Sequence, residues 1–389
     1  MSQGIIIKRG GNGYAKINFD LPIFDMTTPT PLSVARNSLV ATSIGSYALF
    51  GGGYNGSIRF DTVDAYDPQL TRTTPTALSV GKSGLAATSI GNYALFGGGY
   101  AGSASDVVDA YDSQLTRTTP TALSQARFGL FATSIGDYAL FGGGLSGSSS
   151  YSDVVDAYDS SLTRTTPTAL SAARDSLAAT SIGNYALFGG GLGVSLSSAV
   201  DAYDSSLTRT TPTALSVART SLAATSIDDY ALFGGGFTTS PSNVVDAYDS
   251  QLTRTTPTAL SVARRYFSAT SIDDYALFGG GWGVSLSSAV DAYDSSLTRT
   301  TQTELSAARY DFAATSIRNY ALFGGGSNPS VTSFFDEVDA YSPYHRIQVY
   351  PGTKYAFNGS SETLSSTWQT LNYTGALTGY LKIISTNVE

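Results

Sequence analysis

The sequence predicts an all-β protein, a seven-bladed β-propeller, and three observations lead to this fold class. A unit of about 45 residues occurs seven times along the chain. Each unit contains four short segments with strand character, and no segment shows helical periodicity. The N-terminal segment supplies the strand that the last unit lacks. Seven four-stranded units that close on themselves form a propeller.

Three short strings mark the repeat. Tyr-Ala-Leu-Phe-Gly-Gly-Gly occurs in every unit, with its glycines starting at Gly51, Gly97, Gly142, Gly189, Gly234, Gly279 and Gly324. Val-Asp-Ala-Tyr also occurs in every unit, with its aspartate at positions 64, 109, 156, 201, 246, 291 and 339. Thr-Arg-Thr-Thr-Pro-Thr-Ala-Leu-Ser follows in the first five units, and the sixth has Thr-Arg-Thr-Thr-Gln-Thr-Glu-Leu-Ser at 298–306.

The unit from Leu177 to Ser216 illustrates the four predicted strands, named a to d. Strand a covers 177–182, and a Gly-Asn turn leads to strand b at 185–188. Strand b is entirely apolar, as expected for a strand covered on both faces. Strand c covers 199–203 and strand d covers 208–213. The proline in strand d predicts an edge strand, because proline has no N–H to donate.

The two ends of the repeat array predict how the ring closes. The seventh unit stops after its strand c, at Tyr341-Ser342-Pro343. The segment 24–33 aligns with 70–79, which contains strand d of the first unit. We therefore expect the N-terminal segment to form the outer strand of the last blade.

Three regions follow from this alignment. Residues 21–342 form the propeller, residues 1–20 an N-terminal β flank, and residues 343–389 a small C-terminal β extension. Both flanks read as short strands separated by turn signals, for example at 347–350, 355–357, 367–371 and 379–384. Because both flanks adjoin the blade that closes the ring, we interpret them as the attachment to a larger assembly.

Composition narrows the classes of partner and compartment. The chain has 389 residues, 42% of them hydrophobic and only 13% charged, with a net charge of −8. A net negative charge argues against a nucleic-acid partner. There is no cysteine, no apolar run of membrane-spanning length and no signal-peptide pattern. We expect no membrane insertion, and a location on a virion or an extracellular surface, or otherwise in the cytoplasm.

The repeats vary at one end of the blades only. The a–b and c–d turns, which share one face of the disc, barely change between units. The b–c loops and the d–a connections, which share the other face, differ in every unit. A constant frame with one variable face is typical of a recognition surface.

Seven aromatic residues on that face are the candidate ligand-binding residues, because aromatic rings stack on sugars and anchor protein partners. They are Tyr54, Tyr100, Phe128, Phe237, Tyr266, Trp282 and Tyr310. The alternative interpretation is drift in exposed loops.

One basic residue recurs at each d–a junction. These residues are Arg36, Lys82, Arg127, Arg174, Arg219, Arg264 and Arg309. They could line an anion site at the mouth of the channel. The favoured interpretation is a structural ring in which each cation pairs between blades with the repeated aspartate of strand c.

Other chemistry finds little support in the residues. The glycine triplets lack the helix and the Lys-Ser/Thr of a phosphate-binding loop, so positive-φ backbone and tight packing are the favoured interpretation. No loop has the spacing of a calcium loop, and the chain has a single histidine, His345. We therefore expect no metal, no cofactor and no catalytic residues. A carboxylate-pair hydrolase would require acidic residues that break the sevenfold pattern at the channel mouth.

The glycine run after an apolar strand, followed by Val-Asp-Ala-Tyr-Asp, resembles the kelch repeat across residues 21–342. This resemblance implies a β-propeller, but kelch-type propellers include enzymes, scaffolds and adhesins. The oxidase members use histidine ligands and a Cys-linked tyrosine, which this chain lacks. The near-identical repeats are also similar to kelch arrays in tail and surface proteins of bacteriophages and prophages of gut bacteria.

The leading functional expectation is therefore a recognition module, not an enzyme. Its variable face would bind a cell-surface glycan or protein, and its flanks would bind other subunits of a particle, such as a phage tail. Further copies of the same chain are also candidate partners. The alternatives are a purely structural or decorating component and, less favoured, a carbohydrate-active enzyme.

Overall fold

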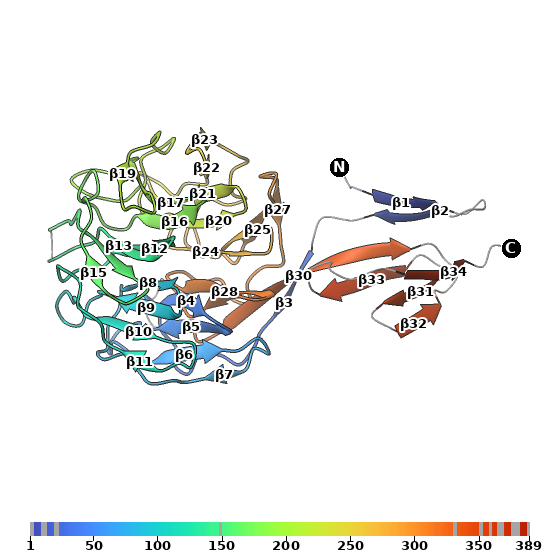
Figure 1. Ribbon diagram of the computed structural model, residues 1–389, viewed down its shortest axis with the longest axis horizontal. Coiled ribbons are helices and arrows are strands. Elements are labelled where there is room, and N and C mark those ends of the chain that lie inside the picture. The colour runs from blue at the N-terminus through green and yellow to red at the C-terminus, as the bar shows by residue number, and fades with distance from the viewer. Residues whose placement is uncertain are drawn as a thin grey trace. The chain divides into compact units, whose positions relative to one another are not determined.

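The computed structural model describes residues 4–8, 14–18, 23–147, 150–329, 333–349, 353–357, 360–363, 369–374 and 382–386. Every regular element in these residues is a β-strand. The chain divides into two compact units, one formed by residues 26–340 and the other by residues 1–25 and 341–389. The larger unit is a propeller whose seven antiparallel sheets surround a central channel (Figure 1). The predicted all-β, seven-bladed fold is thus confirmed.

Each blade contains four strands in sequence order, from the channel outward. Blade 1 contains β4 (Val40–Ile44), β5 (Tyr47–Gly51), β6 (Val63–Tyr66) and β7 (Arg72–Thr73). Blade 2 contains β8 (Ala86–Ile90), β9 (Tyr93–Gly97), β10 (Val108–Tyr111) and β11 (Arg117–Thr118). Blade 3 contains β12 (Phe131–Ile135), β13 (Tyr138–Gly142), β14 (Val155–Asp159) and β15 (Arg164–Thr165). Blade 4 contains β16 (Ala178–Ile182), β17 (Tyr185–Gly189), β18 (Val200–Tyr203) and β19 (Arg209–Thr210).

The remaining blades follow the same order, and the seventh closes the ring. Blade 5 contains β20 (Ala223–Ile227), β21 (Tyr230–Gly234), β22 (Val245–Asp249) and β23 (Arg254–Thr255). Blade 6 contains β24 (Ser268–Ile272), β25 (Tyr275–Gly279), β26 (Val290–Tyr293) and β27 (Arg299–Thr301). Blade 7 contains β28 (Ala313–Ile317), β29 (Tyr320–Gly324), β30 (Val338–Val349) and, as its outer strand, the N-terminal β3 (Ile23–Thr27). The N-terminal closing strand is therefore present, and β28 lies beside β4 (Figure 1).

The first glycine of each triplet fits the blades together. A Cβ atom on Gly51 would lie 2.7 Å from Cε1 of Phe96, a fully buried ring in the next blade. The same contact recurs around the ring and ends with Gly324 of blade 7 against Phe50 of blade 1. The second and third glycines adopt left-handed backbone, with φ of 70° at Gly52 and 115° at Gly53. The glycines therefore serve close packing and the backbone turn that starts the b–c loop.

The aromatic residues of strands b and c form the core between blades. Phe50 and Tyr66 are fully buried and meet edge to face, with ring centroids 5.9 Å apart. The Tyr66 hydroxyl donates a hydrogen bond to the carbonyl oxygen of Thr30, in the connection that enters the blade, at 2.8 Å. This pairing satisfies the polar end of a buried ring, so the tyrosine can anchor that connection.

Strand d is shorter than predicted. The expected strand at 208–213 is reduced to the two residues of β19, and Pro212 lies beyond it. Strand c offers only four residues here, and proline cannot donate to a ladder. The outer strand therefore ends before the proline.

The smaller unit is also built of strands. β1 (Gly4–Lys8) pairs with β2 (Tyr14–Asn18), and β31 (Thr353–Phe357) pairs with β32 (Ser360–Thr363) and β34 (Lys382–Thr386). The last residues of β30 pair with β33 (Gln369–Thr374). β32 was not predicted. Parts of the strands expected at 347–350, 367–371 and 379–384 lie outside the described residues.

Candidate recognition face

The b–c loop and the d–a connection meet side by side in every blade. In blade 1, Asn37 and Tyr54 form an antiparallel bridge, with N–H···O distances of 2.9 and 2.8 Å in the two directions. Tyr54 also forms an antiparallel bridge with Arg59, near the end of the same loop. We call such a set of three residues a row. The other rows are Ser83–Tyr100–Ala104, Phe128–Leu145–Tyr151, Asp175–Leu192–Leu196, Thr220–Phe237–Pro241, Arg265–Trp282–Leu286 and Tyr310–Ser327–Phe334.

The rows turn the variable residues into a continuation of each sheet. Residues opposite each other in an antiparallel pair have Cβ atoms about 4.5–5.5 Å apart, so the three side chains of a row are close neighbours. The aromatic residues predicted from the sequence include one member of every row except that of blade 4, and none of the third members. The third member lies five residues after Tyr54 in blade 1 but seven after Ser327 in blade 7. In blades 2, 4, 5 and 6 the third member follows the second by four residues, so the spacing varies only in blades 1, 3 and 7.

The variable face carries two aromatic clusters. The first, which we call the Arg59 cluster, consists of Arg59, Tyr54, Tyr100 and Phe128. The Arg59 guanidinium carbon lies 5.0 Å from the ring centroid of Tyr54 and 4.5 Å from that of Tyr100. Tyr100 in turn meets Phe128 edge to face at 5.3 Å. The cluster therefore extends over blades 1 to 3, with one arginine between its two tyrosines.

The second cluster, the Arg265 cluster, extends over blades 5 to 7. The Arg265 guanidinium carbon lies 4.2 Å from the ring centroid of Phe237, 5.1 Å from that of Tyr266 and 5.2 Å from that of Trp282. Tyr310 lies 5.6 Å from Trp282 and 6.2 Å from Tyr266, measured between ring centroids. Tyr266 is the most exposed of the predicted aromatic residues, at 41%, and the others are half-buried.

All seven predicted aromatic residues thus belong to one of two clusters, each built around an arginine. The row of blade 4, with Asp175, Leu192 and Leu196, separates the clusters on one side. On the other side Asn37 donates a hydrogen bond from Nδ2 to Oγ of Ser327 at 3.1 Å. Arg59 and Arg265 were not among the predicted ligand-binding residues. Their signal in the sequence is that no other unit has a basic residue at the same row position.

A closed ring of backbone hydrogen bonds borders the channel at this face. The residue after each d–a row member has left-handed backbone, and its N–H donates to the carbonyl of its counterpart in an adjacent blade. The members are Ser38, Gly84, Gly129, Ser176, Ser221, Tyr266 and Asp311. Six of the bonds run from each member to the one before it, and Ser38 N–H to Asp311 O, at 3.0 Å, closes the circle.

Asp311 is the member of this ring that carries a carboxyl group. Ser38 Oγ donates to Asp311 Oδ2 at 2.6 Å, and burial raises the pKa of Asp311 to about 6. Burial also raises the pKa of Asp175 in the row of blade 4. Asp311 lines the channel, whereas Asp175 lies in the row of blade 4, which is not adjacent to blade 7.

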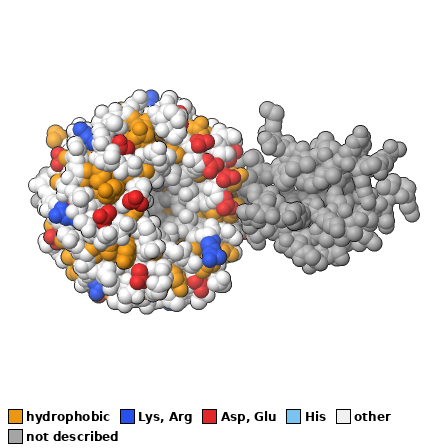
Figure 2. All heavy atoms as spheres, in the orientation of Figure 1, with side chains coloured by type: hydrophobic (Ala, Val, Ile, Leu, Met, Phe, Trp, Pro, Cys, Tyr) orange, Lys and Arg blue, Asp and Glu red, His pale blue; other side chains and the backbone are white. Residues whose placement is uncertain are grey.

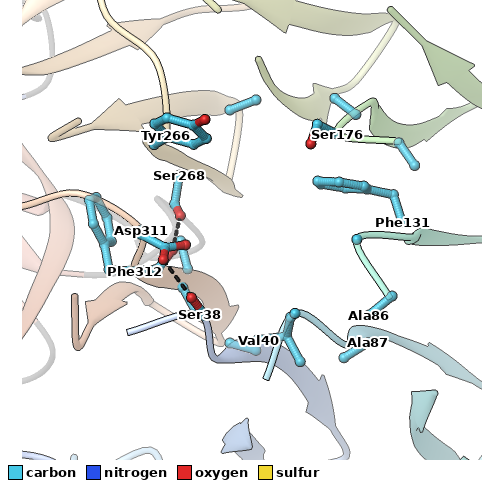
Figure 3. A pocket seen from close by; sticks show the side chains of 18 of the residues that line it. Ser38, Val40, Ala86, Ala87, Phe131, Ser176, Tyr266, Ser268, Asp311 and Phe312 are labelled. Carbon is cyan, nitrogen blue, oxygen red and sulfur yellow. Dashed lines mark hydrogen bonds between the residues drawn. The ribbon is translucent and has the colours of Figure 1, made fainter. Parts of the chain in front are cut away.

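The channel is lined by the start of the first strand of each blade. Its volume is about 390 Å³, and small alanine and serine side chains contribute much of its wall. Tyr266, Asp311 and Phe312 lie on one side, and Ser176 and Phe131 on the other (Figure 3). On the propeller face in Figure 2, hydrophobic side chains surround a central hollow.

The predicted basic ring is buried and does not face the channel mouth. The side chains of Arg36 and Asp64 are 0% exposed, and Arg36 Nη2 lies 2.8 Å from Asp64 Oδ2. Asp64 also accepts from Arg72 Nη1 at 2.9 Å and from the Ser33 backbone N–H at 3.1 Å. Equivalent ion pairs occur in all seven blades. An anion site on these residues is excluded by their burial and pairing.

The predicted pairs with the strand-c aspartates are present, but each pair lies within one blade and not between neighbouring blades. Arg36 precedes the first strand of blade 1, and Asp64 lies in β6 of the same blade. The link between blades is made by the backbone instead, because Arg36 N–H donates to the carbonyl of Phe335 in blade 7 at 3.1 Å. The backbone of each d–a connection therefore bonds to the preceding blade, and its basic side chain is buried in the blade that follows.

Blade 2 carries a weaker version of this pair. Lys82 Nζ lies 3.5 Å from Asp109 Oδ2 and donates to the carbonyl of Val107 at 2.9 Å. Burial lowers the pKa of Lys82 to about 8. A compact ammonium cannot match the fork of arginine, so one lysine in this ring is a local weak point.

These features define the class of the molecule: a seven-bladed β-propeller with a constant frame and one variable face. The part of the chain that the structure describes has no group of three or more acidic or histidine side chains placed to hold a metal ion. Within the same residues, no helix is long and apolar enough to cross a membrane. Models of known protein families give no match to the chain, and no curated protein is significantly similar to it.

Proposed function

We propose that this protein is a non-catalytic recognition module that binds a cell-surface glycan or protein through its variable face. The observation that carries the proposal is the row: sequence differences between blades concentrate in triplets at one face of the propeller. A surface that only drifted would not be expected to gather seven aromatic residues and two unpaired arginines into two clusters. Tyrosine, tryptophan and arginine are the residues most enriched at binding hot spots.

We further propose that the module is part of a phage tail or a similar particle. The near-identical, kelch-like repeats support this assignment. In this proposal the smaller unit would attach the propeller to other subunits of the particle. In this arrangement the propeller would present its variable face to a bacterial cell.

The proposal is tested by binding of the purified protein to a glycan array and to intact bacterial cells. A variant with Tyr54, Tyr100, Phe237 and Trp282 changed to Ala should lose binding while retaining the thermal unfolding of a folded propeller. The matched control changes exposed residues of the constant a–b turns, Asn92, Asp137 and Asn184, to Ala. Loss of binding in the control, or no binding by the wild-type protein to any cell or glycan, would contradict the proposal.

A further inference from the structure

Two arginines of the propeller are held differently from the others. Every other Arg and Lys between residues 26 and 340, except Arg318, forms one of the ion pairs with a strand-c aspartate. Among the described residues, Arg59 and Arg265 have neither a carboxylate partner nor a hydrogen bond from the guanidinium. Both lie in rows of the variable face, whereas Arg318 lies in an a–b turn and donates to Ser46 Oγ.

Aromatic rings satisfy the flat faces of these two guanidinium groups. Arg59 contacts the rings of Tyr54 and Tyr100, and Arg265 contacts those of Phe237, Tyr266 and Trp282. A ring over the face of a guanidinium offers no acceptor to the N–H groups at its edge. Both arginines remain half-exposed. Each cluster therefore presents a fixed guanidinium group whose edge N–H groups are available to bind an anion.

The surroundings also favour a particular kind of anion. A guanidinium binds a carboxylate, sulfate or phosphate through two parallel N–H···O bonds, and ordering by stacking lowers the entropic cost of that contact. Next to each arginine lie tyrosine, phenylalanine or tryptophan rings, whose apolar faces can pack against a sugar ring. An acidic sugar unit offers both features in one group of suitable size.

We propose that the ligand of the variable face is an acidic glycan, whose anionic groups bind Arg59 and Arg265 while its sugar rings pack against the adjoining aromatic residues. This inference rests on the proposed function and names the ligand class of the same face. The Arg59 cluster is centred where blades 1 and 2 meet, and the Arg265 cluster where blades 5 and 6 meet. Two separate cationic clusters suit a polymer with repeated acidic units, because the second contact is then intramolecular.

The test measures binding of the full-length protein to four soluble polymers by calorimetry and by surface-immobilised assay. The probes are polygalacturonate (carboxylated), dextran sulfate (sulfated), dextran (neutral) and polyglutamate (acidic but not a glycan). We expect an acidic glycan to bind, with an affinity that falls as salt is raised. We expect neutral dextran to bind at least about tenfold more weakly, because a charge-paired contact is worth a factor of ten or more.

The variants separate the arginines from general charge. Arg59→Gln with Arg265→Gln should weaken acidic-glycan binding about tenfold or more, whereas Arg318→Gln, an exposed arginine at the other face, should leave it unchanged. Unfolding temperatures of all variants verify the fold. Equal binding of neutral dextran, binding of polyglutamate alone, binding of none of the polymers, or unchanged binding in the double variant would overturn the inference. After any of these results, the proposed function would still hold if cell binding depended on the aromatic residues. If cell binding did not depend on the aromatic residues, the proposed function would be wrong as well.

Discussion

Replacing the first glycine of a triplet by alanine tests how the blades fit together. Gly189 lies at the end of β17, and its φ is outside the left-handed region, so its backbone conformation accepts alanine. The new Cβ would lie 2.7 Å from Cε1 and 3.0 Å from Cδ1 of Phe233, a fully buried ring in the next blade. A buried ring cannot swing away at low cost. Overpacking of this kind costs about 1–3 kcal/mol.

The chain contains a matched control for this change. Gly147 also lacks left-handed backbone, and a Cβ there would have no neighbour within 4 Å. Gly147→Ala should be neutral, or more stable by about 0.4–1 kcal/mol, since alanine restricts the unfolded chain. Thermal unfolding followed by circular dichroism should show a fall of roughly 2–10 °C for Gly189→Ala and no fall for the control.

A double variant distinguishes steric conflict from a general intolerance of alanine. Phe233→Leu alone should destabilise by removing part of a buried ring, about 1–3 kcal/mol. Combined with Gly189→Ala, the shorter side chain leaves room for the new methyl group, so the double variant should cost less than the sum of the two. Strict additivity, or a Gly189→Ala protein as stable as wild type, would refute the packing explanation.

Three further predictions concern buried charges. Arg174→Leu leaves the fully buried Asp201 without its main partner. Urea unfolding should therefore show a free energy of unfolding lower by about 3–5 kcal/mol. The control Arg318→Leu, in an exposed turn, should change it by under about 0.5 kcal/mol. Burial raises the pKa of Asp311 from 3.8 to about 6. Its protonated form therefore stabilises the fold below pH 4, and this contribution is lost as the pH rises through 6. Asp311→Asn should be more stable than wild type by about 3 kcal/mol at pH 8 but not at pH 4. Equal differences in stability at the two pH values would contradict this. The pKa of Lys82 is lowered from 10.5 to about 8. Its contribution to the free energy of unfolding is therefore present above pH 10.5 and is lost as the pH falls through 8. Lys82→Arg should remove the rise in stability between pH 8 and 10.5, and a rise that persists would point to another group.

The repeat pattern predicts the frame well because each element has a local cause. Turn residues, an apolar strand b and the regular period of the glycine triplets predict four strands per blade. The break after Ser342, matched by the segment that begins at Phe24, predicts the closing strand, which is β3 in the structure. These features depend on short stretches of chain, so one sequence is sufficient to infer them.

Contacts that depend on register or on direction could not be inferred in the same way. The pairing of Arg36 with Asp64 inside one blade could not be predicted. It depends on the path of the d–a connection, which decides the blade that the Arg36 side chain enters. The bridge from Tyr54 to Arg59 depends on the conformation of a loop whose spacing occurs in no other blade. The predicted aromatic residues were found by their variation, but their division into two arginine-centred clusters appears only in three dimensions.

Blocking one face of the propeller at a time tests most directly whether the variable face is the binding surface. The chain has no cysteine, so a single introduced cysteine can be labelled selectively with maleimide polyethylene glycol. Val194→Cys places the polymer on a fully exposed b–c loop tip of blade 4, and Asn184→Cys places it on the exposed a–b turn at the other end of the same strand β17. Binding of the two labelled proteins to intact bacterial cells is then compared. We expect the polymer at position 194 to abolish binding and the polymer at position 184 to leave it intact. Loss of binding only with the polymer at position 184 would show that the other face binds the cell.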